Sequence, residues 1–435
     1  MLNRDLIKNV KKQDKEKDVN VFGWLKNKKD FGKIIILRIV DSSGEIRAVA
    51  KTKILKENSF LDIKKLKKES CINVMGNYDS KKKEIQIKEI KIIAAATKSI
   101  SPSARDDFDI YNQKYTSLVC DNRHIYLRNE KIATILKIRS MFMEEMRDYF
   151  QKNNFINFSA PILTNITLYG DKTAFDIDFC GKKLYLTQCT AFYLESAIPA
   201  FEKVYFMSPS FRNEKSKSRR HLSEYWHCKG EIAFCDLEGM MKFVENMTYT
   251  VYKNLVKNAG EEMRKITKID FNKFKPPYKS ITYEKAVEVL QNNGFKIKFG
   301  QSIGSDEERF LGERMKKMFW IKFLPRKVEA FPYRINPSDE RTTLTADLLC
   351  NESGEILGTA EKIYQKEELE RRMREDFVAH PKEIYKWYIE LREMGLPPHS
   401  GFGMGVERVL RSFLNLKHVR DVIPYPRLYT RLPYP

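Results

Sequence analysis

Residues 211–226 contain the side chains with the clearest capacity for chemistry. The sequence FRNE at 211–214 is followed by a serine- and lysine-rich stretch and then by RRHLSEYW at 219–226. Apolar runs flank this segment, which predicts a strand, a charged loop and a second strand. The guanidinium of Arg212 can bind a phosphate, and the carboxylate of Glu214 can face a base amino group. The segment can therefore grip a nucleotide, although a solvated surface hairpin fits these residues equally well.

A second segment, GFGMGVER at 401–408, places glycine at every second position and ends in an arginine. Alternate residues of a strand share one face, so the three glycines would leave that face bare and let a flat ligand lie against the backbone. Arg408 begins an apolar helical run and can stack on a purine. Taken alone, the glycine pattern is also typical of a tight turn or a bulge.

In their order and spacing, these two segments resemble motifs 2 and 3 of the class II aminoacyl-tRNA synthetases. Motif 1 has a counterpart in a helical run at 132–150 that leads into FINFSAPILT at 155–164. In the family, this helix and strand form the interface of a homodimer. The chain is most similar to the asparaginyl-tRNA synthetases, especially the archaeal type, and the resemblance covers essentially the whole chain. Further stretches that carry it are LTQ at 186–188, YLE at 193–195, GEILG at 354–358, PHSGFG at 398–403 and DVIPYPR at 421–427.

The resemblance implies a nucleotide site built by these motifs. Arg212 would hold the α-phosphate of ATP and the incoming carboxylate, and Arg408 would stack on the adenine, so these two arginines would be the catalytic pair. Tyr225 would cover the other face of the adenine, and Glu214 would meet its amino group. The other positions that the resemblance assigns to ATP are Arg220 and His221 at the β- and γ-phosphates, Leu222, Gly405 and Glu355.

The amino-acid pocket implied by the resemblance departs from the family pattern. The family has an acid where this chain has Tyr169, with Asp171 two residues on, and a second acid where it has Lys229. An arginine that grips the substrate side chain falls on Lys362, and lysine cannot reproduce the bidentate fork of arginine. An ammonium at position 229 would repel the α-ammonium of an amino acid. The remaining pocket positions are Gln188, Ala191 (where the family has glutamine) and Gly358.

Three functions follow from this pattern. The first is an ATP-dependent asparaginyl-type aminoacyl-tRNA ligase, which forms an aminoacyl adenylate and charges tRNA. The second is a paralogue that adenylates a different acid, such as one without an α-amino group, and aspartyl-type enzymes also remain close. The third is a non-catalytic RNA-binding or regulatory relative, against which Arg212, Glu214 and Arg408 argue, because a pure binder does not need an adenine clamp.

The elements that must position these residues indicate an α+β fold. Five short β-rich runs in a basic N-terminal region predict an OB-fold barrel at 1–96, followed by a linker at 97–125. Alternating helical and strand patterns then run through 126–435, where the resemblance implies an antiparallel sheet flanked by helices. The barrel runs are 19–25, 34–40, 46–50, 71–76 and 85–93, and helices are expected at 239–258 and 283–293.

In the family, the barrel holds the tRNA anticodon. Its aromatic and glutamine positions fall on Ile36 and Arg47, and isoleucine has no π-face on which a base can stack. Trp24 and Phe31 are alternative stacking platforms, although Trp24 also fits the barrel core.

The charge of the chain favours a polyanionic partner such as tRNA. Lysine and arginine number 79 against 58 aspartate and glutamate, a formal charge of +21. Residues 1–100 hold 25 basic and 13 acidic residues, and thus an excess of 12. A general lysine bias would produce the same excess.

Composition also limits where in the cell the protein is expected and which metal ion it could bind. There is no apolar run of membrane-spanning length and no apolar core like that of a signal peptide, so we expect a cytoplasmic protein without a membrane partner. Seven scattered cysteines are typical of reduced thiols. The six histidines show no zinc-like spacing. A metal would be Mg²⁺, which the resemblance places at Glu355 with Asp347 nearby.

Overall fold

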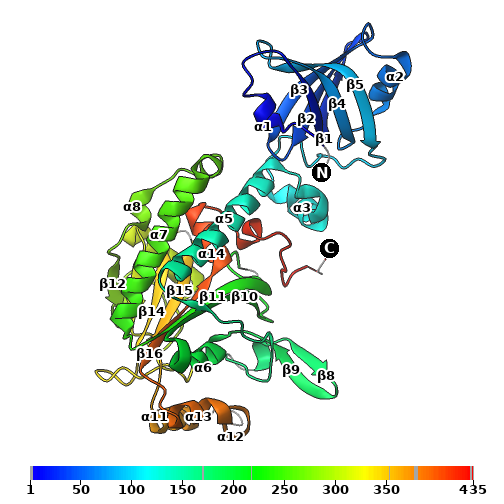
Figure 1. Cartoon of the computed structure of the whole chain (residues 1–435). Coiled ribbons are helices and arrows are strands. Elements are labelled where there is room, and N and C mark those ends of the chain that lie inside the picture. The colour runs from blue at the N-terminus through cyan, green and yellow to red at the C-terminus, as the bar shows by residue number, and fades with distance from the viewer. Residues whose placement is uncertain are drawn as a thin grey trace. The chain divides into compact units, whose positions relative to one another are not determined.

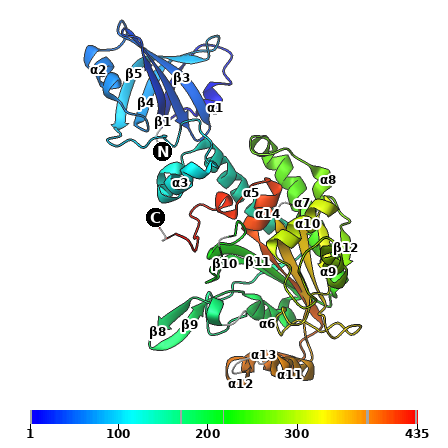
Figure 2. The ribbon, with the colours of Figure 1, turned by 180° about the vertical axis from the view of Figure 1, so that it is seen from behind.

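The structure, a computed structural model, describes residues 3–168, 171–216, 218–351, 353–376, 381–431 and 434. The chain divides into two compact units, coloured by residue number in Figures 1 and 2. Unit 1 comprises Met1–Val119 and Ile125–Glu130, and unit 2 comprises Cys120–His124 and Lys131–Pro435. No helix within the described residues is long and apolar enough to cross a lipid bilayer.

Unit 1 contains a closed barrel with the strand order β1-β2-β3-β5-β4. Each strand covers one of the five predicted runs, and helix α2 (Glu57–Lys65) connects β3 to β4. Short helix α1 (Ile7–Val10) precedes β1. The strands are β1 (Lys17–Asp30), β2 (Ile34–Asp41), β3 (Gly44–Lys51), β4 (Cys71–Asp79) and β5 (Glu84–Ala94).

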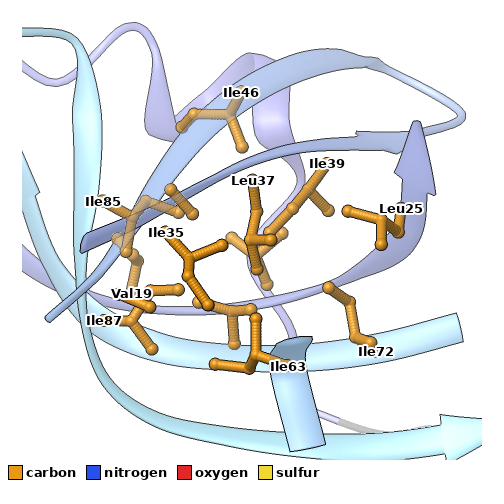
Figure 3. Packing of buried hydrophobic residues seen from close by; sticks show 14 of the residues in the cluster. Val19, Leu25, Ile35, Leu37, Ile39, Ile46, Ile63, Ile72, Ile85 and Ile87 are labelled. Carbon is orange, nitrogen blue, oxygen red and sulfur yellow. The ribbon is translucent and has the colours of Figure 1, made fainter. Parts of the chain in front are cut away.

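The barrel closes around an aliphatic core because its strands alternate in side-chain direction. In β2, Ile35, Leu37 and Ile39 are fully buried, whereas Arg38 between them is exposed. Figure 3 shows these three side chains converging with branched residues from the other strands and with Ile63 of α2. The barrel is therefore a filled core, and any ligand must bind on its outer surface.

The segment that we expected to link the domains packs largely as part of unit 1. The carboxylate of Glu69 accepts from Arg105 at 3.0 Å and from Arg128 at 3.1 Å. The hydroxyl of Tyr126 donates to the carbonyl oxygen of Pro102 at 2.8 Å. Three short elements follow in this region: η1 (Gln113–Tyr115), α3 (Thr116–Asp121) and α4 (Arg123–Tyr126).

Unit 2 is built on an eight-stranded sheet with the order β12-β13-β14-β15-β16-β11-β10-β6. The six strands from β13 to β10 pair antiparallel, as expected, whereas the outer pairs β12–β13 and β6–β10 are parallel. The strands are β6 (Ile156–Asn157), β10 (Lys203–Phe211), β11 (Glu224–Ala233), β12 (Lys279–Thr282), β13 (Phe319–Lys322), β14 (Thr345–Cys350), β15 (Gly354–Glu361) and β16 (His399–Gly405).

Helices and a small second sheet surround the large one. The small sheet has the order β7-β9-β8, with β7 (Leu163–Thr164), β8 (Asp176–Phe179) and β9 (Lys182–Leu186). The helices are α5 (Glu130–Lys152), α6 (Ala191–Phe201), α7 (Leu237–Arg264), α8 (Phe271–Phe274), α9 (Tyr283–Gln291), α10 (Ser305–Met315), α11 (Lys366–Glu375), α12 (Pro381–Ile384), α13 (Lys386–Glu393) and α14 (Val406–Phe413), with 3-10 helices η2 (Asp171–Thr173) and η3 (Val419–Val422).

Helices α5 and α7 cover one face of the large sheet, whereas α6 packs on the opposite face only at the ends of β10 and β11 and leaves the rest of that face uncovered. Phe402 of β16 packs against Phe150 of α5 and Phe243 of α7, with ring centroids 6.2 and 6.1 Å apart. Because side chains alternate along a strand, Gly401 and Gly403 face the opposite side. The sequence motifs thus lie on the uncovered face of β11 and β16, which pair with each other.

Candidate active site on the large sheet

One cavity of about 280 Å³ lies on the uncovered face of the large sheet. Arg212 and Arg408, from distant parts of the chain, both line it. Most other predicted site residues line the same cavity: Ala191, Arg220, His221, Leu222, Tyr225, Lys229, Asp347, Glu355, Gly358, Lys362 and Gly405. The two sequence motifs therefore meet in one site.

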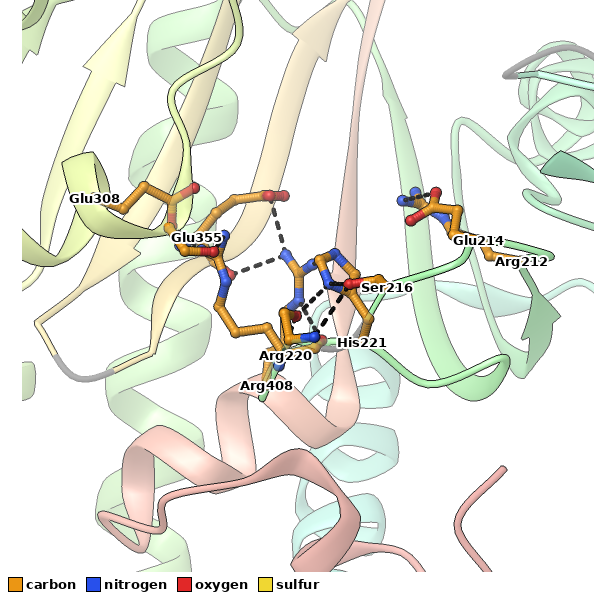
Figure 4. A network of polar contacts seen from close by, with 10 residues as sticks. Arg212, Glu214, Ser216, Arg220, His221, Glu308, Glu355 and Arg408 are labelled. Atoms are coloured by element: carbon orange, nitrogen blue, oxygen red, sulfur yellow. Dashed lines mark hydrogen bonds and ion pairs between the residues drawn. The ribbon is translucent and has the colours of Figure 1, made fainter. Parts of the chain in front are cut away.

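Arg408 is fixed at this site by contacts to four neighbouring groups, one of which is the carbonyl oxygen of Arg220 at 3.4 Å (Figure 4). Its guanidinium donates to the Glu355 carboxylate at 3.0 Å and to the Glu355 carbonyl oxygen at 3.1 Å. Its Nη2 lies 3.3 Å from Nε2 of His221, which is 187 positions away in the chain. Burial, together with Arg408, Arg220 and Arg212, lowers the pKa of His221 to about 4. The imidazole is therefore neutral at pH 7 and faces the arginine as an acceptor.

Arg220 is held by a different partner. Its guanidinium pairs with Glu308 and donates to the hydroxyl of Ser305 at 2.7 Å, both from the start of α10. Burial raises the pKa of Glu308, although Arg220 opposes the shift. A phosphate that binds Arg220 must compete with this carboxylate.

Arg212 and Tyr225 lie together where the β10–β11 hairpin meets the cavity. The guanidinium carbon of Arg212 is 5.9 Å from the ring centre of Tyr225. Glu214 forms an ion pair with Arg212 at 3.5 Å and does not line the cavity. The hairpin thus supplies a cation and an aromatic ring to the cavity, as expected, whereas Glu214 contacts the arginine.

Two predicted metal ligands, Asp347 of β14 and Glu355 of β15, line the cavity. Burial and the nearby carboxylates of Glu355, Glu329 and Glu308 raise the pKa of Asp347 well above its ordinary value. Burial would also raise the pKa of Glu355, but Arg408 and Arg212 outweigh it and the net shift is downward. Within the described ranges, no three His, Cys, Asp or Glu side chains group as a metal site.

The far end of the cavity contains alternating charges from β11. Lys229 and Glu231 lie on one face of this strand, opposite Gly403 and Gly401 of β16. A Cβ on Gly403 would lie 2.2 Å from Nζ of Lys229, and a Cβ on Gly401 would lie 2.2 Å from both carboxylate oxygens of Glu231. These glycines therefore make room for charged side chains, which corrects our expectation of a bare face for a flat ligand.

The ammonium of Lys362 is already paired with protein carboxylates, whereas a residue that binds the substrate side chain is expected to be unpaired before substrate binds. Its Nζ lies 3.5 Å from Glu195 and 3.8 Å from Glu231. Burial would lower the pKa of Lys362, but Glu231 and Glu195 outweigh it and raise the pKa. Glu195 also binds Arg392 at 2.8 Å and the hydroxyl of Tyr388 at 2.6 Å. The lysine is thus one member of a buried charge network.

The remaining predicted pocket residues lie at the edge of this region or outside the described residues. Gln188 accepts from the backbone N–H of Leu168 at 3.2 Å and donates to the Thr173 hydroxyl at 2.9 Å, and it does not line the cavity. Asp171 begins η2, and Tyr169 falls outside the described residues.

Several residues of this region were not assigned to the site from the sequence, among them His227, Glu231 and Glu329, which line the cavity, and Glu195, which contacts Lys362. Glu231 follows Lys229 by two positions, and the strand period would have placed it in the same pocket. Glu195 lies in the YLE stretch that carries the resemblance, but its role depends on partners from distant segments, which the stretch does not reveal.

The four candidate nucleic-acid residues belong to unit 1. Trp24 is 36% exposed, with the guanidinium of Arg105 5.6 Å from the centre of its ring. It therefore does not belong to the barrel core, which was the alternative that the sequence left open. Phe31 is 64% exposed. Ile36 lies in β2, and Arg47 of β3 pairs with Glu84 at 3.1 Å.

The fold and site define a class II aminoacyl-tRNA synthetase with an OB-fold domain. Residues 116–429 match the family model of "tRNA synthetases class II (D, K and N)", and residues 19–93 match the "OB-fold nucleic acid binding domain". The chain is 34% identical to the asparagine–tRNA ligase of Pyrococcus abyssi, with both chains fully covered. It is 32% identical to that of Thermoplasma acidophilum, over 95% of this chain and 96% of the relative.

Solved structures show the same relationship. Asparaginyl-tRNA synthetase from Pyrococcus horikoshii, complexed with asparaginyl-adenylate, superposes with a TM-score of 0.92 at 32% identity, with both chains fully covered. The chain therefore belongs to the asparaginyl-tRNA synthetase family, and the predicted resemblance and α+β fold class are confirmed.

Proposed function

We propose that this protein is an ATP-dependent aminoacyl-tRNA ligase of the asparaginyl type. It forms an aminoacyl adenylate and then transfers the acyl group to tRNA. The observation that carries the proposal is the convergence of Arg212 and Arg408 in one cavity, next to Tyr225. Full-length relatives named asparagine–tRNA ligases support the choice of amino acid.

Activation requires orientation and charge neutralisation more than proton transfer. The substrate carboxylate attacks the α-phosphorus of ATP, and the bond to the bridging oxygen breaks to release pyrophosphate. Arg212 would neutralise the α-phosphate and orient the carboxylate, and the adenine would lie between Tyr225 and Arg408. The neutral imidazole of His221 and the guanidinium of Arg220 would contact the β- and γ-phosphates. The ion pair between Arg220 and Glu308 would break as the nucleotide binds.

We infer that Glu355 and Asp347 hold Mg²⁺ together with phosphate oxygens. Burial and the nearby carboxylates raise the pKa of Asp347, and a divalent cation held by Asp347 and Glu355 would offset the repulsion among these carboxylates. Two protein carboxylates plus substrate phosphates are the ligand set that Mg²⁺ typically takes. The ion would supply further neutralisation of the phosphates.

The barrel is the proposed anticodon-binding domain, with residues 1–96 for tRNA, 97–125 as the connection and 126–435 for catalysis. Exposed Phe31 and half-exposed Trp24 offer stacking surfaces for bases. Glu214 remains a proposed contact to the adenine amino group, once the nucleotide has drawn Arg212 away from it.

We further propose a homodimer in the cytosol. Ile156 and Leu163, in the segment that resembles motif 1, are 45% and 43% exposed, and a partner subunit would bury them. All seven cysteines are free thiols, which suits a reducing compartment.

The test is asparagine-dependent exchange of pyrophosphate into ATP. The unaltered protein should catalyse exchange with asparagine, and Arg408→Ala should reduce it by roughly a hundredfold or more, because one electrostatic contact to the transition state is lost. Arg309→Ala, on the exposed surface of α10, should behave like the unaltered protein. Binding of ATP without exchange for any amino acid would contradict the proposal.

A further inference from the structure

Lys229 and Glu231 present a donor and an acceptor side by side at the far end of the cavity. Both side chains line the cavity from the same face of β11. Alternate residues along a strand are about 7 Å apart. Tyr225 lies on the same strand, about 14 Å before Lys229 by the same spacing. A substrate joined to the nucleotide near Tyr225 therefore extends its own side chain toward Lys229 and Glu231.

Lys229 has no partner among the residues that the structure describes. The residue is only 7% exposed, and no hydrogen bond or ion pair within 4 Å to its ammonium occurs within those residues, although Lys229 is near enough to Glu231 to lower the pKa of that carboxyl. Its ammonium lies over Gly403, close to Nε2 of His227. Burial and then Lys229 lower the pKa of His227 well below its ordinary value, so the imidazole is neutral. A buried ammonium without a hydrogen-bond partner is costly, and a ligand oxygen would reduce that cost.

One carboxylate oxygen of Glu231 faces a lysine, and the other has no hydrogen-bond partner in the described part of the chain. Its Oε1 lies 3.8 Å from Nζ of Lys362, whereas its buried Oε2 has no hydrogen-bond partner among the described residues. The other nearby carboxylate, Glu195, already accepts from Tyr388 and Arg392. Oε1 of Glu195 likewise has no hydrogen-bond partner among the described residues, but Glu195 does not line the cavity. At this end, the cavity wall therefore offers a ligand the charged donor of Lys229 and the charged acceptor of Glu231.

A primary carboxamide matches this pair, because it presents one acceptor oxygen next to an N–H₂ donor. We propose that Lys229 and Glu231 together recognise the side-chain carboxamide of asparagine: Lys229 donates to the amide oxygen, and Oε2 of Glu231 accepts from the amide nitrogen. This inference rests on the proposed function and names the residues that select its substrate.

The pair also accounts for discrimination against aspartate and for the departure from the family pattern. An aspartate side chain would place a carboxylate against the Glu231 carboxylate, and such a juxtaposition is repulsive. Lysine at 229 replaces an acid and repels an α-ammonium, so asparagine must bind with its α-ammonium directed away from Lys229. Lys362 is committed to Glu195 and Glu231. The pocket still has one acid and one base for the amide, but the acid is at 231 and the base is at 229.

The test measures amino-acid binding and chemistry separately. Isothermal titration with a non-hydrolysable ATP analogue present gives the Kd for asparagine and for aspartate, and pyrophosphate exchange gives kcat/KM. Lys229→Met should weaken asparagine binding roughly tenfold or more, because a charged hydrogen bond is lost. Lys229→Gln keeps an N–H donor and should lose less. Lys285→Met, on an exposed turn of α9, is the matched control and should leave the Kd unchanged.

Glu231→Gln tests the acceptor. The new amide can donate to a carboxylate, so the preference for asparagine over aspartate should fall roughly tenfold or more. A residue with only a structural role would not change this ratio. Thermal unfolding of each variant, with ATP-analogue affinity, establishes that the fold and the nucleotide site are intact.

The outcomes separate this inference from the proposed function. If exchange occurs but folded Lys229→Met and Glu231→Gln retain the original Kd and ratio, the inference is wrong and the function stands. If exchange fails but asparagine binds and Lys229→Met weakens it, the inference stands and the function falls. Preference of the unaltered protein for aspartate, or no binding of asparagine, would overturn the carboxamide assignment.

Discussion

Glu231 is the residue whose ionisation should set the pH dependence of substrate choice. Burial raises the pKa of its carboxyl to about 7, with Glu195 adding to the rise and Lys362, His399 and Lys229 opposing it. Below that pH the neutral carboxylic acid tolerates a carboxylate ligand, and above it the ionised group repels one. We expect the asparagine-to-aspartate ratio of kcat/KM to increase between pH 6 and 8, measured by pyrophosphate exchange. A flat ratio across that range would contradict this assignment.

The same titration affects stability. Because the folded-state pKa of Glu231 lies above its ordinary value, its stabilising contribution is complete below that ordinary value. The contribution is then lost as the pH rises through about 7. Glu231→Gln removes this titration, so its stability should depend less on pH in that window.

At the residue scale, the sequence was sufficient for groups that belong to a motif and insufficient for groups defined by their partners. Arg212, His221, Tyr225 and Arg408 could be located because their type and spacing are specific. From the sequence, Lys362 is a weak replacement for arginine. Its commitment to Glu195 and Glu231 is not visible there, because both glutamates are distant from it in the chain. Whether a charged group is committed or free depends on tertiary contacts that spacing does not reveal.

The glycines of β16 yield a prediction at the level of the strand. A Cβ on Gly403 would lie 2.2 Å from the Lys229 ammonium, so Gly403→Ala must displace that side chain. We expect asparagine-dependent exchange to fall at least tenfold and the free energy of unfolding to drop by about 1–3 kcal/mol, as for other overpacked sites. The measurements are exchange kinetics and denaturant unfolding.

Gly405 provides the matched comparison for stability. A Cβ there would approach only the Arg408 side chain, at 3.6 Å, and its φ of −76° suits any residue. Gly405→Ala should therefore change the unfolding free energy by less than about 1 kcal/mol. Equal destabilisation by the two variants would mean that crowding by Lys229 is not the cause.

Elements with strong periodicity were predictable, and short ones were not. The barrel strands and the helix expected at 239–258, observed as Leu237–Arg264, follow from alternating or helical apolar patterns. Strands β6 and β7 have two residues each, too few for any period. The parallel pairing of β6 and β12 at the sheet edges depends on neighbours distant in sequence, which local patterns cannot specify.

The charge of the whole molecule predicts different salt responses for its two activities. The chain has a formal charge of +21, and its first 100 residues contain 25 basic against 13 acidic residues. Binding of tRNA releases counterions and weakens steeply with salt, whereas the buried charges around the nucleotide cavity are little screened. Between 50 and 200 mM KCl, we expect KM for tRNA to rise at least tenfold and the exchange rate to change less than twofold. If tRNA charging and pyrophosphate exchange depended equally on salt, the basic residues of the N-terminal region would not be the main tRNA contacts.

The position of β16 has a consequence for how this chain is made. This strand joins β11 to β15 in the middle of the large sheet, yet it is the last of the sixteen strands found in the described part of the chain. Until the ribosome has released residues 399–405, the two halves of the sheet expose unpaired edges, the kind of surface that associates with other chains. Arg408 lies three residues after the end of that strand, so the proposed pair of arginines in the nucleotide site is complete only when the sheet can close. Adenine nucleotides would then stabilise completed molecules selectively, and truncated products would depend on chaperones.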